Sequence, residues 1–139
     1  MTTGGFEILR KQFGTLEQSF VDGVNLVVAE SEKEGLEYNQ TAYVLATAYH
    51  ESAGTFLPVK EAYWLSENWR KQNLRYYPYY GRGLVQITWK ENYSKAGNKL
   101  GYGEQFANSP DMVMDQDISV KILVRGSKEG WFTTRKLSD

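Results

Sequence analysis

The chain has 139 residues, a length that suits one domain with a single modest core. It carries 16 basic and 17 acidic side chains, and this balance argues against a nucleic-acid-binding protein, which normally shows a basic excess. It contains no cysteine, which excludes disulfides, a thiolate nucleophile and a cysteine zinc site.

The first residues, 1–6, lack the basic and then apolar pattern of a signal peptide. No apolar run approaches the ~20 residues that a helix needs to span a bilayer. We therefore expect a protein that is made in the cytoplasm and is not embedded in a membrane.

The first predicted helix covers residues 15–34. Thr15 and Gln18 have the spacing of a capping box, and apolar residues recur after them at helical spacing. The next helix begins at Asn39, a favourable N-cap residue. The predicted inner stripe of this second helix is Ala42, Leu45, Ala46 and Tyr49.

Glu51 stands near the predicted end of the second helix. It lies six positions after Leu45, about 240° further around the helix at ~100° per residue, so we expect it to point away from the buried stripe. Gly54 then allows the chain to turn. A carboxylate in this place is expected to line a cleft.

The middle of the chain is predicted to be irregular. Ser66 is expected to cap a short helix that reaches Arg70. Residues 76–83 are expected to form a loop because Pro78, Gly81 and Gly83 interrupt any periodic pattern.

Two further helices are predicted in the second half. Thr88 and Glu91 have capping-box spacing and begin a helix that reaches about residue 100, where Gly101 closes it. Ser109 and Pro110 begin a final helix that ends near residue 126. The sum is a mainly helical chain whose irregular segments carry the polar residues.

Three kinds of active site are excluded or disfavoured by spacing. A zinc-protease helix needs a second histidine four residues after His50, but position 54 is glycine and the chain has one histidine. The Gly81–Gln86 segment lacks the third glycine of a dinucleotide-binding loop. A Ser-His-Asp site is disfavoured because the sequence contains no Gly-x-Ser-x-Gly motif, which forms the turn that usually carries the serine.

The remaining combination is two carboxylates, Glu51 and Glu61, followed by Gln86 and Thr88. Glycosidases use one carboxyl group to protonate the leaving oxygen and another to activate water. Eight aromatic residues lie within residues 63–89, and such rings stack on sugar faces.

Each residue also has a purely structural interpretation. A glutamate near a helix end is usually solvated. Thr88 is explained by helix capping, Gln86 by binding backbone groups in a loop, and His50 by packing. Arg82 between two glycines suits a structural role because its five donors can tie loops together.

Several segments together resemble glycoside hydrolase family 19, the chitinase-like hydrolases that include many phage endolysins. The segments that carry the resemblance are Ala48–Ser52, the region of Glu61, Tyr79–Thr88, Glu91–Tyr93, Asn108–Asp111, Gly130–Thr133 and Lys136–Asp139. The resemblance extends from about residue 15 to the last residue.

This resemblance implies a mainly α, lysozyme-like fold with two lobes and a central cleft, formed by residues 1–139 as a single catalytic domain. It implies that Glu51 is the general acid, that Glu61 is the general base and that Thr88 helps to hold the attacking water. Glu67 is the alternative base. The residues that it assigns to substrate binding are Gln86, Asn92, Tyr79, Tyr80 and His50. It also implies inversion at the anomeric carbon, for which the two carboxyl groups stand about 6.5–9.5 Å apart.

Family members continue beyond the segment that matches Lys136–Asp139, so we expect this domain to be short at its C-terminus. Three functions fit the pattern: a peptidoglycan hydrolase of the endolysin type, a chitinase, and a non-catalytic glycan-binding relative. We expect a monomer with a polysaccharide partner and no cofactor or metal. An endolysin would reach the cell wall after a holin-type partner opens the membrane.

Overall fold

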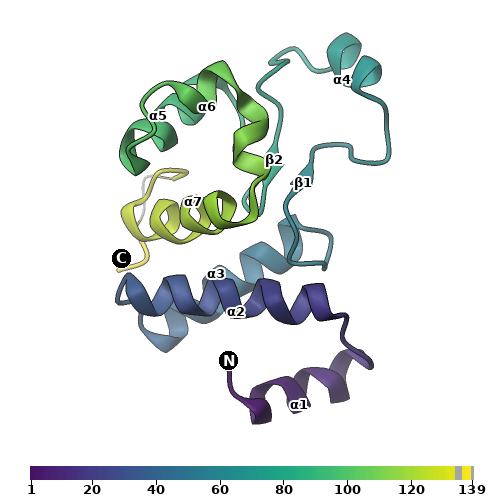
Figure 1. Ribbon diagram of the computed structural model, residues 1–139, viewed down its shortest axis with the longest axis vertical. Coiled ribbons are helices and arrows are strands. Elements are labelled where there is room, and N and C mark those ends of the chain that lie inside the picture. The colour runs from purple at the N-terminus through teal and green to yellow at the C-terminus, as the bar shows by residue number, and fades with distance from the viewer. Residues whose placement is uncertain (134–135, 139) are drawn as a thin grey trace.

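The computed structural model describes residues 1–133 and 136–138 of the chain, and most of these residues are helical (Figure 1). The helices are α1 (Thr3–Phe13), α2 (Gln18–Lys33), α3 (Tyr38–Glu51), α4 (Glu67–Asn73), α5 (Lys90–Leu100), α6 (Gln105–Asn108), the 3-10 helix η1 (Pro110–Met114) and α7 (Gln116–Glu129). The two short strands are β1 (Val59–Lys60) and β2 (Arg82–Gly83). The prediction of a mainly α fold is confirmed, and Asp139 lies outside the described residues.

The helices are stacked in layers around α7 (Figure 1). Helices α1, α2 and α3 lie together on one side, and α7 contacts both α2 and α3. Helix α5 and the η1 segment contact α7 from the other side. The two strands and α4 project from one end of this stack. Helix α1, which the sequence did not predict, ends at Phe13 and is followed by Gly14, whose φ is +82°.

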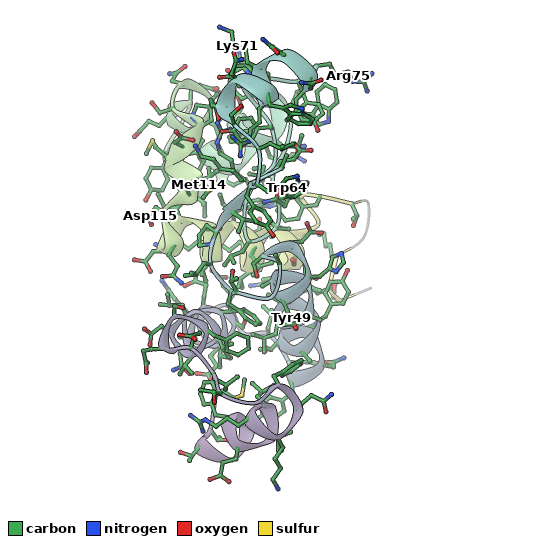
Figure 2. The ribbon with its side chains drawn as sticks, turned by 90° about the vertical axis from the view of Figure 1, so that its right-hand side faces the viewer. Tyr49, Trp64, Lys71, Arg75, Met114 and Asp115 are labelled. Carbon is green, nitrogen blue, oxygen red and sulfur yellow. The ribbon has the colours of Figure 1, made fainter. Side chains whose placement is uncertain are left out.

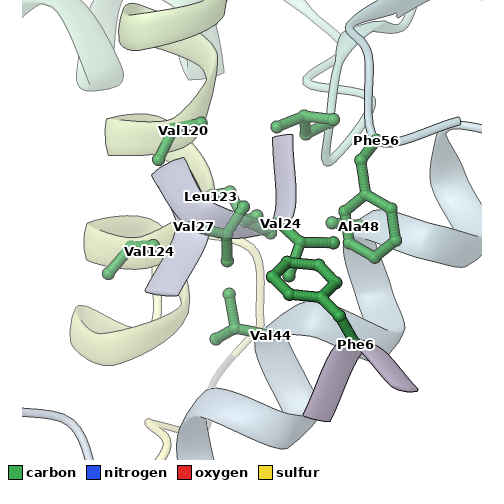
Figure 3. Close-up of a cluster of buried hydrophobic side chains, with 10 residues drawn as sticks. Phe6, Val24, Val27, Val44, Ala48, Phe56, Val120, Leu123 and Val124 are labelled. Atoms are coloured by element: carbon green, nitrogen blue, oxygen red, sulfur yellow. The ribbon is translucent and has the colours of Figure 1, made fainter. Parts of the chain in front are cut away.

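A first cluster of buried side chains fills the space between α2, α3 and α7 (Figure 3). Its members are Phe6, Val24, Val27, Val44, Ala48, Phe56, Leu84, Val120, Leu123 and Val124. Phe6 is the buried residue of α1, so this side chain attaches the first helix to the core.

A second buried cluster lies on the other side of α7. Its members are Ile87, Tyr93, Ala96, Phe106, Val113, Ile122 and Trp131. Helix α7 therefore contributes to both clusters, with Leu123 on one side and Ile122 on the other. Because it separates the two halves of the core, α7 is buried on more of its circumference than a surface helix.

The predicted inner stripe of α3 is confirmed only at Leu45, which packs against the first cluster, and is wrong at its other positions. The buried residues of this helix are Val44 and Ala48, whereas Ala46 is exposed. Glu51 follows Val44 by seven residues and Ala48 by three, so it continues the buried face instead of leaving it. The cause is tertiary, because α3 packs against both α2 and α7.

Three predicted helix starts are also wrong. Helix α2 begins after Glu17, not at Thr15. Helix α3 begins after Glu37, whose side chain forms a capping box with Gln40. Helix α5 begins after Trp89, so Thr88 is not its cap. In each case the favourable capping residue lies within two residues of the observed N-cap but is not the N-cap itself.

Other boundaries agree with the sequence. Ser66 caps α4 by accepting a hydrogen bond from the Trp69 amide at 3.1 Å, as predicted. Gly101 closes α5 in the left-handed conformation. The predicted final helix is divided, because η1 follows Ser109 and a new cap at Asp115 then begins α7, which ends at residue 129.

Gly23 of α2 lies against the backbone of Phe56, the segment that leads into β1 and Glu61. A Cβ atom at Gly23 would stand 2.5 Å from the Phe56 carbonyl oxygen. We expect Gly23→Ala to lower the free energy of unfolding by about 1–3 kcal/mol because the two segments must separate. Urea denaturation measures this change. Gly4→Ala is the control, since a Cβ there meets its nearest atom at 3.9 Å, and an equal loss in both variants would contradict the prediction.

Membrane insertion of a helix has no support in the described part of the chain, where every helix is too short or too polar to cross a bilayer.

Candidate functional site

Glu61 directly follows β1 and is held through its backbone. Strands β1 and β2 pair antiparallel, with Val59 opposite Gly83 and Lys60 opposite Arg82. The Glu61 amide donates a hydrogen bond to the Gly81 carbonyl at 2.7 Å. The Glu61 carbonyl in turn accepts one from Arg70 Nε at 2.7 Å. Both backbone groups of Glu61 are therefore fixed.

The Glu61 carboxylate is held at both of its oxygens. The Tyr76 hydroxyl donates to Oε1 at 2.6 Å, and the Gly81 amide donates to Oε2 at 3.0 Å. A carboxylate offers about four lone-pair positions, so two donors leave about two positions open. The Glu61 carboxylate is therefore oriented and keeps acceptor positions for a further donor.

The glycine-rich motif builds the support for Glu61. Gln86 Nε2 donates to the Val59 carbonyl at 2.8 Å and to the Gly83 carbonyl at 3.0 Å, which ties β1 to β2. A Cβ at Gly81 would stand 2.7 Å from Gln86 Oε1, so a larger residue there would displace the Gln86 amide. The amide of Gln86 thus has a structural role, and a contact of Gln86 with sugar stays a prediction.

Arg82 forms the buried centre of the same motif. Its guanidinium lies 3.8 Å from the centre of the Tyr80 ring. It donates to the Pro78 carbonyl at 2.8 Å, to the Tyr93 hydroxyl at 3.0 Å and to Asp111 Oδ1 at 2.9 Å. The structural role that the sequence favoured for Arg82 is confirmed.

Glu67, the alternative base, is surrounded by more donors than Glu61. The hydroxyls of Tyr77 and Tyr80 donate to its carboxylate at 3.0 Å and 3.1 Å, and Arg70 Nη1 does so at 3.2 Å. Partial burial acts to raise the pKa of Glu67, but these hydrogen bonds and the charges of Lys60 and Arg70 outweigh it and hold the pKa below its usual range. A weaker base results.

The lowered pKa of Glu67 predicts acid sensitivity. Because the folded-state pKa is lowered, the stabilisation is complete above the ordinary value of 4.5 and is lost as the pH falls through the folded value. We expect the unfolding temperature of the parent to decrease as the pH falls below about 4.5, and we expect a smaller decrease in Glu67→Gln. Calorimetry between pH 7 and pH 3 measures it. Glu7→Gln, on exposed α1, is the control, and an identical slope in all three proteins would contradict the prediction.

Glu51 is half-buried at the C-terminal end of α3 and lines a cavity of about 570 Å³. The residues that line this cavity are Asn39, Gln40, Tyr43, Thr47, Glu51, Val85, Gly126, Ser127, Gly130, Phe132, Thr133, Lys136 and Leu137. The prediction that Glu51 lines a cleft is confirmed. The predicted reason was different, because Glu51 continues the buried face of α3 and does not point away from it. Neither Glu61 nor His50 is part of this lining. His50, which directly precedes Glu51 in the sequence, is exposed.

Thr88 and Asn92 follow the motif. Thr88 Oγ1 donates to the Gln86 carbonyl at 3.0 Å, and Asn92 Nδ2 donates to the Thr88 carbonyl at 2.8 Å. Each side chain is therefore oriented by the backbone next to it. The Thr88 oxygen keeps its acceptor capacity. Their roles in holding water and sugar stay predictions.

The predicted place of Tyr80 in the cleft is wrong. Its exposed fraction is 0%, because the ring lies beneath Arg82 and its hydroxyl is bound to Glu67. Tyr79 is half-buried, packs at a tilt against Tyr93 and donates to the Ala107 carbonyl at 3.0 Å. Tyr80 therefore belongs to the scaffold of the site, and a contact of Tyr79 with sugar stays a prediction.

Other aromatic side chains are exposed near Glu61. Trp64 is 71% exposed and packs edge-on against Tyr63 with ring centres 5.2 Å apart. Figure 2 shows Trp64 on the same face of the molecule as Tyr49 of α3. Arg70 Nη2 donates to the Ala62 carbonyl at 3.0 Å, which holds the turn that carries these rings.

Comparison with known proteins identifies the family. Residues 35–135, more than half of the chain, match the family described as chitinase class I, which is glycoside hydrolase family 19. The chain belongs to this family. The acidic 26 kDa endochitinase of Solanum lycopersicum is 45% identical over 47 residues, which cover 33% of this chain and 19% of the relative. Endochitinase EP3 of Arabidopsis thaliana is 30% identical over 105 residues, which cover 70% of this chain and 35% of that protein.

A solved chitinase has the same fold. The chain superposes on chitinase C of Streptomyces griseus HUT6037 with a TM-score of 0.54 and 20% identity, and the match covers 86% of this chain and 51% of that one. The predicted lysozyme-like fold of the chitinase type is confirmed. As a member of the chitinase class I family, the chain spans well under two thirds of the length of the relatives that it matches.

Two residues of the site were missed by the sequence. Tyr76 contacts the Glu61 carboxylate, and Arg70, which is 5% exposed, binds the carbonyls of both Glu61 and Ala62. The aromatic-rich stretch pointed toward Tyr76 only as one ring among eight. No sequence signal marked Arg70, because its contacts depend on how the loop between β1 and α4 folds back. Within residues 1–133 and 136–138, no group of acidic and histidine side chains is arranged to hold a metal ion.

Proposed function

We propose that the chain is a glycosidase that hydrolyses β-1,4 linkages in polymers of N-acetylhexosamines, with bacterial peptidoglycan as its substrate. The observation that carries the proposal is where the two carboxylates lie and which donors bind them. Glu51 lines a cavity, and Glu61 is held by two donors with lone pairs to spare. Membership of the chitinase class I family supports a reaction of this kind.

In the proposed mechanism, Glu51 donates a proton to the glycosidic oxygen while Glu61 accepts a proton from the attacking water. Thr88 helps to hold that water. Glu61 is preferred to Glu67 because three donors, one of them a cation, already surround the Glu67 carboxylate. Attack by water from the opposite face inverts the anomeric carbon.

Peptidoglycan is preferred because Lys136 lines the cavity next to Glu51. A cation there complements the carboxylates of the stem peptides, which chitin lacks. Chitin is the second candidate, because the relatives in Solanum lycopersicum and Arabidopsis thaliana are named endochitinases. An endolysin role, with release through a holin-type partner, belongs to the first candidate.

The test exposes the same purified protein to two substrates. Clearing of outer-membrane-stripped bacterial cells, with chitin oligomers left intact, is expected if peptidoglycan is the substrate. Cleavage of the oligomers alone identifies a chitinase. Absence of both activities, together with retention of the protein on either polymer, identifies a non-catalytic glycan-binding relative and overturns the proposal. Proton NMR of fresh products is expected to show the inverted anomer.

A further inference from the structure

Tyr76 is the side chain that contacts the Glu61 carboxylate most closely. Its hydroxyl stands 2.6 Å from Oε1, within the range of about 2.5–2.7 Å that is typical of a hydroxyl bound to an ionised carboxylate. The ring is half-buried and packs against Trp89 with the ring centres 5.1 Å apart. Arg75 lies over the same Trp89 ring at 5.5 Å. The phenol is therefore presented to Glu61 from a fixed position.

We propose that Tyr76 is the positioning residue for the general base. Its hydroxyl orients the Glu61 carboxylate, so that the lone pairs left open face the attacking water. This inference rests on the proposed function, because it concerns the same carboxylate and its role as base.

The surroundings of Glu61 support this assignment. Burial first, and then the bond to Glu61, raises the pKa of Tyr76 to about 12, so the phenol stays protonated and remains a donor well above neutral pH. The other donor to the carboxylate is the Gly81 amide, which does not titrate. The nearby cations are Arg70, bound to the Glu61 carbonyl, Lys60, which precedes Glu61, and Arg75, which lies close enough to Tyr76 to act on its charge.

The chain contains its own matched control. The next residue, Tyr77, donates to Glu67 Oε1 at 3.0 Å, which is the same kind of bond to the competing carboxylate. Replacing either tyrosine by phenylalanine removes one hydroxyl and keeps the ring. Tyr76→Phe and Tyr77→Phe therefore distinguish the role of Glu61 from the role of Glu67.

The experiment measures kcat and KM separately for the parent and the two variants. For Tyr76→Phe we expect kcat to fall about tenfold and KM to change by less than about twofold, because the substrate still binds while the carboxylate loses the donor that orients it. Tyr77→Phe is expected to leave kcat within about twofold of the parent. An unchanged kcat in Tyr76→Phe, or an equal fall of kcat in both variants, overturns the inference.

A second measurement does not depend on catalysis. Carbon-13 NMR follows the Glu61 carboxyl signal, which is assigned by its loss in Glu61→Gln. At neutral pH we expect this signal to move in Tyr76→Phe, because the carboxylate loses a hydrogen-bond donor, and to stay in place in Tyr77→Phe. An inactive parent defeats the proposed function but still permits this test, and an unmoved signal in Tyr76→Phe defeats the inference itself. If Tyr76→Phe unfolds, 3-fluorotyrosine at position 76, a stronger donor of nearly the same shape, is expected to move the signal, and an unchanged signal would overturn the inference.

Discussion

Replacing Glu51 by glutamine is expected to lower kcat by about 10²–10⁴-fold, the usual contribution of a positioned general acid or base. Glutamine keeps the size of the side chain and its place in the cavity between α3 and the end of α7. It has no acidic proton, so the leaving oxygen must depart unprotonated. Because the contacts with the sugar are kept, KM should change by less than about threefold.

The choice of substrate sharpens the Glu51 experiment. A leaving group that needs no protonation, such as fluoride, should be released by Glu51→Gln almost as fast as by the parent. Glu61→Gln should fail with both kinds of substrate, because activation of water is still required. Glu32→Gln, exposed on α2, is the control for a general loss of negative charge. Equal loss on both substrates in Glu51→Gln would contradict its role as the acid.

The sequence was sufficient where a helix boundary depends on local chemistry. Ser66 caps α4 because its hydroxyl reaches the Trp69 amide, and Gly101 closes α5 because glycine tolerates a positive φ. It failed where neighbours decide. Helix α3 buries Val44 and Ala48 because both α2 and α7 pack against the face that carries these residues. A periodic pattern alone does not tell which of two apolar stripes will meet a partner.

The candidate site likewise contains features that the sequence predicted and features that depend on tertiary contacts. The motif identified Glu51 and Glu61 as the carboxylates of interest, but it did not tell what holds them. The donors to the Glu61 carboxylate come from positions fifteen and twenty residues later in the chain. Tyr80, which the sequence placed in the cleft, is covered because Arg82 stacks on its ring. Such contacts form only once β1, β2 and the loop between them are folded together.

Arg82 is the residue whose loss should destabilise this region most. Its side chain is 4% exposed, and it satisfies the Pro78 carbonyl, the Tyr93 hydroxyl and Asp111 at once. Methionine fills a similar volume but donates no hydrogen bond, so Arg82→Met leaves the Pro78 carbonyl without this donor. We expect a loss of about 1–3 kcal/mol in the free energy of unfolding, because the Pro78 carbonyl and the Tyr93 hydroxyl each lose a donor, while Asp111, whose side chain is 68% exposed, is solvated by water.

Denaturation by urea and by heat measures this loss, and for a chain of this length the unfolding temperature should fall by roughly 3–12 °C. The matched control is Lys60→Met, because Lys60 pairs with the same Asp111 at 3.4 Å from a position that is 34% exposed. A surface pair of this kind contributes about 0–1 kcal/mol, so the control should remain near the parent. Similar losses in the two variants would mean that Asp111, and not the contacts of Arg82 with Tyr80, Tyr93 and Pro78, dominates. The Gly81 amide binds the Glu61 carboxylate, and Gly81 directly precedes Arg82. Arg82→Met should therefore also lower kcat, even at temperatures at which the variant is fully folded. A folded variant with full activity would show that the contacts of Arg82 do not affect the position of the base.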